Sequence, residues 1–183
     1  RIEGAPMVYL GAEDGWWHVV DDMEELRSRT AKVFPDQPHF LFGHSMGSFL
    51  SRTHLIRYPG AWDGCILCGT GHPSRAVIAG GKLLTDKEIR RLGKNAFSVR
   101  VDDIAFGAYN RRFAPVRTKH DWVSVSQENV DAYIADPLCG GDVTLGLFRD
   151  MLDGLTYITR QSNMEKMDKE TPVFFIAGDQ DPV

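Results

Sequence analysis

Residues 40–50 read FLFGHSMGSFL, and the rest of the chain is organised around them. The apolar run FLF predicts a buried strand, and the run from Phe49 to Tyr58, closed by Pro59-Gly60, predicts a helix. Between them, residues 43–47 read GHSMG and have the spacing G-x-S-x-G. In the order strand, motif, helix, this spacing predicts a sharp turn that leaves the hydroxyl of Ser45 clear of the backbone.

The chemistry of this turn has two interpretations. Ser45 is a candidate nucleophile, with Gly43 and Gly47 leaving room for strand and helix to approach. The backbone N–H of Met46 is then the donor that faces a developing oxyanion. His44 completes the motif, and its side chain is expected to point away from that of Ser45. The alternative is a glycine-rich turn whose serine only caps the helix; the flanking strand and helix favour the nucleophile.

Composition places the chain among ordinary globular proteins of one domain. It has 183 residues, a net charge of −4 and no basic cluster, which argues against nucleic acid as a partner. No apolar run approaches the ~18 residues of a membrane span, and the first residues do not have the pattern expected of a signal peptide. Since the chain begins with Arg1 and stops at Val183, directly after a strand-like run, we expect a fragment of a longer protein.

The three cysteines indicate free thiols. Cys65 and Cys68 have C-x-x-C spacing, but they lie in an apolar run that predicts a strand, where positions three apart face opposite sides. They cannot chelate one ion there, so we expect buried thiols, a reducing compartment and a cytoplasmic location. Cys139 lies in a glycine-rich turn and is expected to be structural. No metal and no cofactor are expected.

The first part of the chain predicts alternating helices and strands. Apolar residues at helical spacing predict a helix over residues 15–34 with Asp14 as its N-cap. This set consists of Trp16, Val19, Val20, Met23, Leu26 and Val33. A strand at 39–42, the helix after the motif and a strand at 62–69 follow. Two strands joined by such a helix should be parallel and right-handed. Their apolar character predicts a sheet that is covered on both faces.

Residues 72–168 predict a helical insertion, interpreted as a lid over the site. Thr85-Asp86-Lys87-Glu88 has the pattern of a capping box, Ser126 begins another helix, and Asp142 caps a longer one. Residues 110–120 carry four cations and are either an anionic-ligand patch or, as we favour, a solvated loop. The segment is also rich in aromatic residues, which either line a site for an acyl chain or form the lid's own core: Phe97, Phe106, Phe113, Trp122 and Tyr133.

Residues 172–177 form the clearest predicted strand, and acidic residues follow it. Asp181 comes just past the carboxyl end of this strand, at the edge where open α/β sheets place their sites. It also follows Ser45 in the chain order serine, acid, histidine. Asp181 is therefore the candidate acid of a triad, Asp179 is its competitor, and an acidic turn without a catalytic role remains open. The expected organisation is a core at 1–71, the insertion at 72–168, and a core strand with the acid turn at 169–183.

Taken together, these residues resemble the α/β-hydrolases of the lysophospholipase and monoglyceride-lipase type, also called serine aminopeptidase-like hydrolases. The similarity covers most of the chain and includes FGHSMGS at 42–48, Asp121-Trp122, DPLCG at 136–140 and GDQDPV at 178–183. It implies a partial α/β-hydrolase fold, with a mostly parallel sheet flanked by helices and a helical lid. It also implies Ser45 as nucleophile, Asp181 as acid and the N–H of Met46 as first oxyanion donor.

Two parts of the family pattern are missing from the chain. Nothing before residue 15 matches the early strands or the His-Gly oxyanion loop. None of the six histidines follows Asp181, so the catalytic histidine is expected beyond the end of the chain. The expected activity is hydrolysis of a small carboxylic ester, lipid-like as in a lysophospholipid or monoacylglycerol, with these 183 residues alone inactive. A peptidase or thioesterase of the same fold, and a non-catalytic binding protein, are the alternatives.

Overall fold

The computed structural model describes residues 8–181, and its centre is a sheet of three parallel strands in the order β1-β2-β3. The strands are β1 (Phe40–His44), β2 (Gly64–Cys68) and β3 (Val173–Ile176). Phe42 lies opposite Ile66, which lies opposite Phe174. The predicted parallel α/β arrangement is confirmed. Pro182 and Val183, which complete the expected acid turn, lie outside the described residues.

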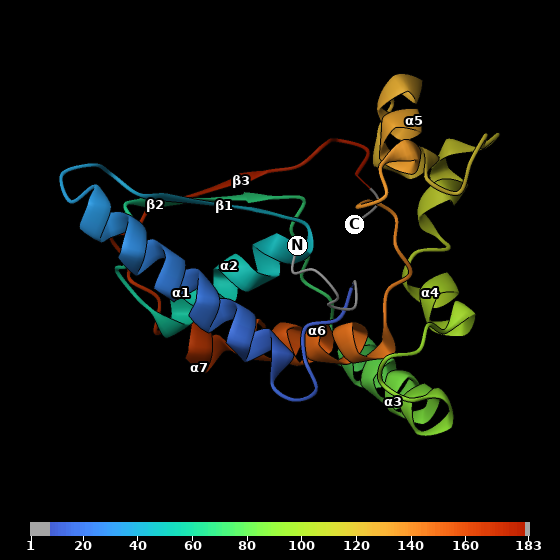
Figure 1. The fold of residues 1–183 in the computed structure, drawn as a ribbon, viewed down its shortest axis with the longest axis horizontal. Helices are drawn as coiled ribbons and strands as arrows, with labels where there is room; N and C mark the ends of the chain where they lie inside the picture. The colour runs from blue at the N-terminus through green and yellow to red at the C-terminus, as the bar shows by residue number, and fades with distance from the viewer. Residues whose placement is uncertain (1–7, 182–183) are drawn as a thin grey trace.

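Three long helices lie on one side of this sheet (Figure 1). They are α1 (Gly15–Val33), α2 (Met46–Arg57), which connects β1 to β2, and α6 (Leu145–Ile158). Apolar side chains from all three helices meet in one buried cluster, joined by Ile78 from α3 (Arg75–Leu92). Its buried members are Trp16, Val20, Phe49, Leu50, Ile56, Ile78, Leu155 and Ile158. The helix that begins at the serine turn is therefore held by neighbours on both sides.

The indole of Trp16 joins these three helices. It is 1% exposed, and its Nε1 donates a hydrogen bond to Oγ1 of Thr53 on α2 at 3.1 Å. On α6, Gly154 packs so closely against the ring that a Cβ placed there would lie 2.1 Å from Cε2 of Trp16. Only a residue without a side chain allows this approach of α6 to α1.

A second buried contact ties α1 to α2 through His54, whose side chain is fully buried. Nδ1 of His54 accepts a hydrogen bond from Nε1 of Trp62 at 3.1 Å. Because an indole N–H only donates, Nδ1 carries no proton, and the ring proton is on Nε2. Nε2 lies 3.1 Å from Oε2 of Glu24, although the N–H is poorly aligned with that oxygen. The histidine is therefore neutral and buried, away from the serine turn.

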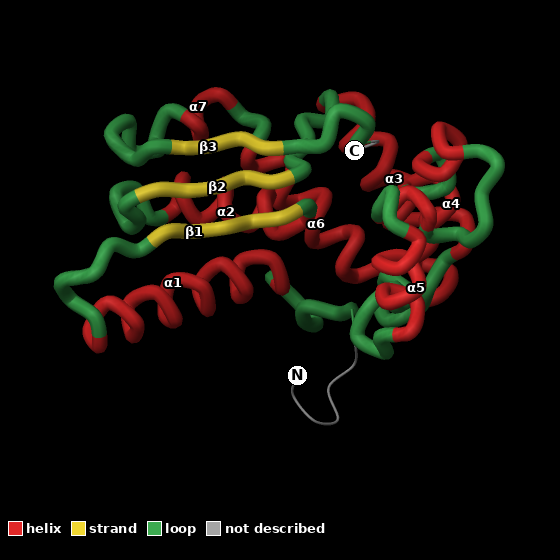
Figure 2. Tube along the Cα trace, turned by 90° about the horizontal axis from the view of Figure 1, so that it is seen from above, coloured by secondary structure: helices red, strands yellow, loops and turns green. Residues whose placement is uncertain are grey.

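The segment between β2 and β3 contains the remaining helices. They are α3, α4 (Val99–Ala105), two short 3-10 turns at Tyr109–Phe113 and Asp121–Val123, α5 (Gln127–Ala135), α6 and α7 (Gln161–Met164). α3 packs on α6, whereas α4 and α5 lie beyond the carboxyl ends of the strands (Figures 1 and 2). This one segment thus supplies part of the core and also the elements that face the strand ends.

Local signals misplaced two helix starts in this segment. The predicted capping box at Thr85–Glu88 is wrong, because α3 already begins after Ser74, whose hydroxyl accepts the N–H of Val77. Thr85 and Glu88 are buried inside that helix. The predicted cap at Asp142 is also wrong, because the hydroxyl of Thr144 caps α6 by accepting the N–H of Leu147. The predicted start at Ser126 is confirmed, since its hydroxyl accepts the N–H of Asn129.

The start and the apolar face of α1 differ in detail from the prediction. Asp14 precedes α1 as expected, but its side chain makes no capping hydrogen bond. Leu26 and Val33, assigned to the buried face, are each 68% exposed. The buried stripe thus ends before the last turns of the helix.

The sheet is covered by helices on one face within the described part of the chain, so the prediction of two covered faces is wrong there. Phe40, Phe42 and Phe174, which share the other face, are 60–62% exposed. The strands are apolar on both faces, but an apolar side chain does not by itself show that a helix covers it. On the opposite face, Leu41 and Leu67 are buried in one cluster with Leu55 of α2, and Met23 of α1 packs against it.

Substituting Gly154 with alanine should destabilise the protein. A methyl group at this position collides with the ring of Trp16, and overpacking of this kind costs about 1–3 kcal/mol. Gly80→Ala is the matched control, because a Cβ on Gly80, in the interior of α3, meets no described atom within 4 Å. That variant should gain up to about 1 kcal/mol in helix propensity. Urea unfolding measures both; equal stability of the two variants would contradict the packing.

The stability of the protein should rise with pH across the titration of His54. Burial lowers the pKa of His54 from its ordinary 6.5, so the unfolded chain binds the proton more readily than the folded one. The contribution is complete above pH 6.5 and is lost as pH falls from there toward the lowered folded pKa. Urea unfolding at a series of pH values, with His54→Gln as control, should show a steeper rise of the unfolding free energy with pH in the wild type than in the variant. Equal slopes would refute the assignment.

Candidate active site

The serine turn is a strained connection between a strand and a helix. β1 ends at His44, α2 begins at Met46, and Ser45 between them has φ 51° and ψ −121°. Side chains disfavour this region of backbone space, at a cost of about 1–3 kcal/mol. The N–H of Ser45 donates to the carbonyl of Cys68 at the end of β2 at 2.9 Å. The neighbouring strand therefore holds the strained residue in place.

Gly43 is the point where β1 and α2 approach most closely. A Cβ on Gly43 would lie 2.3 Å from Oγ of Ser51 and 2.5 Å from the carbonyl oxygen of Gly47. A Cβ on Gly47 would meet no atom of the described chain within 4 Å. The absence of a side chain at Gly43 thus lets the helix start directly above the strand, while Gly47 faces open space.

The start of α2 provides a hydrogen-bond donor beside Ser45. Met46 is the first residue of the helix, so its N–H has no carbonyl partner inside the helix. The N-terminal end of a helix also carries a partial positive charge. The N–H of Met46 therefore suits an oxygen atom that gains negative charge next to the serine hydroxyl.

Asp181 lies at the same edge of the sheet. The chain turns after β3, and the N–H of Asp181 donates to the carbonyl of Gly178 at 3.2 Å. Oδ2 of Asp181 lies 3.2 Å from where a Cβ on Gly69 would be, and Nε2 of His44 lies 3.8 Å from the same point. Gly69 directly follows Cys68, the residue that binds the N–H of Ser45. The serine and the acid thus approach neighbouring residues at the end of β2.

Ser45 and Asp181 open into one cavity of about 970 Å³. Its floor comes from the strand ends, and its walls come from the segment between the two 3-10 turns and α5. The floor residues are His44, Ser45, Cys68, Gly69, Gly178, Asp179, Gln180 and Asp181. The wall residues include Phe113, Arg117, Trp122, Val123, Val125, Val130 and Tyr133. Polar groups lie at the base of this cavity, whereas much of the wall is apolar.

The walls of this cavity are braced by polar contacts. The carboxylate of Asp121 accepts hydrogen bonds from the N–H groups of Arg117 and Thr118 and from the Thr118 hydroxyl. These contacts hold the pKa of Asp121 below its usual range. Nη1 of Arg117 pairs with Oδ1 of Asp131 at 2.7 Å. Arg117 is thus the member of the basic 110–120 stretch that lines the cavity, and it is already bound to a carboxylate.

The histidines that the sequence offers differ in where they lie and what they contact. His44 lines the floor, where it follows the strand and precedes the serine. His54 is bound to Trp62, and His120 lies against the ring of Tyr133 at 5.3 Å between centroids. Burial lowers the pKa of both His54 and His120.

Sequence reasoning missed Cys68 as a cavity residue. It is half-buried at the carboxyl end of β2 and lines the floor beside Ser45. The signal was present, because the last residue of a parallel strand lies at the edge where the sites form. Cys65, three positions earlier, is 2% exposed, and burial raises the pKa of its thiol to about 11. The two thiols therefore differ in surroundings, as opposite faces of a strand require.

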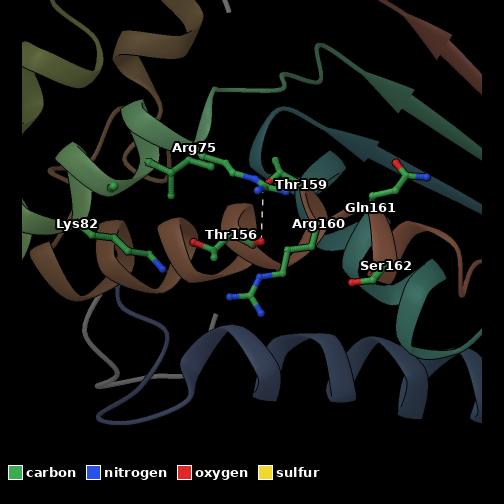
Figure 3. A pocket seen from close by; sticks show the side chains of 9 residues that line it. Arg75, Lys82, Thr156, Thr159, Arg160, Gln161 and Ser162 are labelled. Carbon is green, nitrogen blue, oxygen red and sulfur yellow. Dashed lines mark hydrogen bonds between the residues drawn. The ribbon is translucent and has the colours of Figure 1, made fainter.

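A second cavity, of about 600 Å³, lies away from Ser45 between α3 and the end of α6. Figure 3 shows Arg75, Lys82 and Arg160 around it. Nζ of Lys82 is already paired with Oδ1 of Asp153 at 2.7 Å. None of the residues proposed from the sequence for the site lines this cavity, so it is distinct from the one at the serine turn.

Two kinds of feature are absent from residues 8–181. No group of three or more histidine, cysteine, aspartate or glutamate side chains in that range is arranged to hold a metal ion. None of the described helices is both long and apolar enough to cross a membrane.

Comparisons with known proteins agree on the fold. The profile of the family described as "Serine aminopeptidase, S33" matches residues 9–183. A thermostable carboxyl esterase from Bacillus coagulans, solved with glycerol, aligns with TM-score 0.80 and 24% identity over 90% of this chain and 54% of its own. A lipase in an open form aligns with TM-score 0.75 and 20% identity, over 91% of this chain and 55% of its own. A comparison with curated proteins found no significant match.

A more distant structure is similar over the same span. It is a soluble variant of monoglyceride lipase from Saccharomyces cerevisiae with a substrate analogue, at TM-score 0.61 and 16% identity. It covers 90% of this chain and 52% of its own. The chain thus spans about half the length of the structures it matches. At these identities the likeness establishes the α/β-hydrolase fold.

Replacing Ser45 by glycine should stabilise the protein relative to replacing it by alanine. Both variants remove the hydroxyl, but only glycine adopts φ 51° and ψ −121° without strain. We expect Ser45→Gly to exceed Ser45→Ala by about 1 kcal/mol in unfolding free energy, the lower end of the range for such strain. Urea unfolding of the two variants measures the difference. Equal stability, or a more stable alanine variant, would mean that the turn is not strained.

Proposed function

Because the chain belongs to the serine aminopeptidase S33 family of hydrolases, we propose that its protein hydrolyses carboxylic esters with Ser45 as the nucleophile. The observation that carries the proposal is the strained Ser45 on the floor of a cavity that it shares with Asp181. The N–H of Met46, directly after the serine, supports it further. A serine that only capped the helix would accept an N–H from the first turn, and Ser45 makes no side-chain cap.

The proposed reaction is acyl transfer to water. A histidine that follows Asp181 in the full-length protein takes the proton of Ser45, whose oxygen attacks the ester carbonyl. The N–H of Met46 and a second donor from outside this chain stabilise the oxyanion. Asp181 orients the histidine and stabilises its positive charge. Water then releases the acid from the serine. Without the histidine and the second donor, these 183 residues are expected to be nearly inactive.

We propose a lipid-like substrate, of the lysophospholipid or monoacylglycerol kind. Support comes from the apolar wall of the cavity, where Phe113, Trp122 and Val125 stand across from the polar floor. An acyl chain fits such a wall, and the ester group then lies at the floor beside Ser45. The residues that form this wall, between the 3-10 turns and α5, belong to the proposed lid at residues 72–168. A peptidase or thioesterase would use the same serine. We also propose a cytoplasmic location, which the free thiol of the buried Cys65 supports.

The proposed roles of the two aspartates are separable by substitution in the full-length protein. Asp181→Asn should lower kcat for a short p-nitrophenyl ester by about 10⁴-fold, because an amide orients the histidine in the wrong tautomer. Asp179→Asn is the matched control and should stay within about threefold, well below the loss of a triad member. Steady-state kinetics with Ser45→Ala as the inactive reference measure both. A large loss in Asp179→Asn with little loss in Asp181→Asn would reverse the assignment.

Hydrolysis of esters with acyl chains of increasing length tests the substrate class in the same preparation. A lipid-like site predicts that kcat/KM rises with chain length, since each buried methylene adds about 0.8 kcal/mol. A flat profile with fast cleavage of aminoacyl amides would favour the peptidase instead. No hydrolysis of any ester or amide that depends on Ser45 would leave the binding protein as the remaining reading.

A further inference from the structure

Arg52 crosses from α2 to the loop that leaves β2. Its Nη1 donates to the carbonyl of Gly71 at 2.8 Å and lies 3.5 Å from Oγ1 of Thr70. Its Nη2 lies 3.5 Å from Nδ1 of His72. One guanidinium thus contacts three consecutive residues of a segment that has no helix or strand of its own. Arg52 is two turns along the helix that begins directly after Ser45.

The loop held by Arg52 begins at the floor of the candidate active site. Gly69, two residues before the carbonyl that Arg52 binds, has φ +55° and lines the cavity. Its N–H donates to the carbonyl of Ile176, the last residue of β3, at 2.9 Å. The carboxylate of Asp181 and the ring of His44 both approach the position that a Cβ on Gly69 would take. A shift of this loop therefore displaces the surface against which Asp181 rests.

Arg52 combines partial burial with the lack of an ion pair, whereas the other unpaired arginines of the described part are exposed. Six other arginines of the described part form ion pairs with a carboxylate: Arg27, Arg29, Arg57, Arg91, Arg117 and Arg149. Arg52 forms none with residues 8–181, yet it is half-buried, and burial lowers its pKa. Its guanidinium instead contacts a backbone carbonyl and the side chains of Thr70 and His72. Taking a guanidinium partly out of water costs free energy, which a surface arginine would avoid by staying hydrated.

We propose that Arg52 is a positioning residue, which fixes the exit of β2 on α2 and so holds Gly69 and Asp181 in register with Ser45. This inference rests on the proposed ester hydrolysis, because it assigns a role within that same site. The contact joins the helix that starts at the nucleophile directly to the loop beside the acid. Displacement of a catalytic group by about 1 Å can cost about 100-fold in rate, even when the substitution is far from the chemistry.

Three variants of the full-length protein test the proposal. Arg52→Met keeps an unbranched apolar stem and removes all the donors of the side chain, whereas Arg52→Lys keeps the charge and a donor for the carbonyl of Gly71. Arg57→Met is the matched control, because Arg57 lies on the same helix and pairs with Asp21 on α1 at 3.0 Å, away from the cavity. For each variant, kcat and KM for a p-nitrophenyl ester are measured well below the midpoint of thermal unfolding.

We expect Arg52→Met to lower kcat about tenfold with KM within about twofold, and Arg52→Lys to lower kcat only about threefold. Arg57→Met should lower the unfolding midpoint and leave kcat unchanged, which separates positioning from general stability. If Arg52→Met does not fold, Arg52→Lys decides alone, through a lowered kcat at unchanged KM. Two results overturn the proposal. In the first, Arg52→Lys has wild-type kcat, and the folded Arg52→Met has the same kcat as Arg57→Met. In the second, Arg52→Lys has wild-type kcat and Arg52→Met does not fold.

The same preparations distinguish a failure of the proposed role of Arg52 from a failure of the proposed ester hydrolysis. A wild type without hydrolysis that Ser45→Ala abolishes overturns the proposed function and, with it, the role of Arg52. A wild type with Ser45-dependent hydrolysis, in which Arg52→Met and Arg57→Met have the same kcat, overturns only the role of Arg52. A loss that appears in KM rather than in kcat also overturns it, because the contact would then act on substrate binding.

Discussion

The hydrogen bond from the N–H of Ser45 to the carbonyl of Cys68 is the contact on which the arrangement of the site depends. Ser45 has a backbone conformation that side chains disfavour, so something outside the turn must hold it. The end of β2 holds it, and the carboxylate of Asp181 lies beside the next residue, Gly69. One short strand end therefore sets the distance between the proposed nucleophile and the proposed acid.

That strand end is itself held by a core to which distant parts of the chain contribute. α6 begins more than 70 residues after the end of β2, yet Gly154 packs against Trp16 of α1, and Leu155 belongs to the same cluster as Trp16. The segment between β2 and β3 is consequently more than a cover for the cavity. Its helix α6 packs against α2, and the part between the 3-10 turns and α5 forms the cavity wall. One segment therefore both supports the helix after Ser45 and lines the cavity.

The strands and the serine turn were predictable because their signals are local. The run FLF, the glycine at position 43 and the helix after it lie within a few residues of one another. The start of α3 was not predictable in the same way, because Thr85 and Glu88 satisfy a capping pattern yet are buried in the interior of a longer helix. There Glu88 accepts hydrogen bonds from Arg91 of the same helix and from Ser98 beyond its end. The contact of Arg52 with Gly71 joins residues 19 apart through a loop, and no periodicity encodes it. Of the site, the sequence order predicted Ser45 and Asp181 as candidates, whereas their meeting at Gly69 depends on the register of three strands.

The central claim is that Ser45 is an activated nucleophile, and covalent labelling tests it most directly. The full-length protein is incubated with a fluorophosphonate, and the site of attachment is identified by mass spectrometry of its peptides, with Ser45→Ala as control. The account predicts one adduct, on the peptide that contains Ser45, and none in the variant. An unlabelled wild type, or an adduct on another residue that persists in Ser45→Ala, would contradict it.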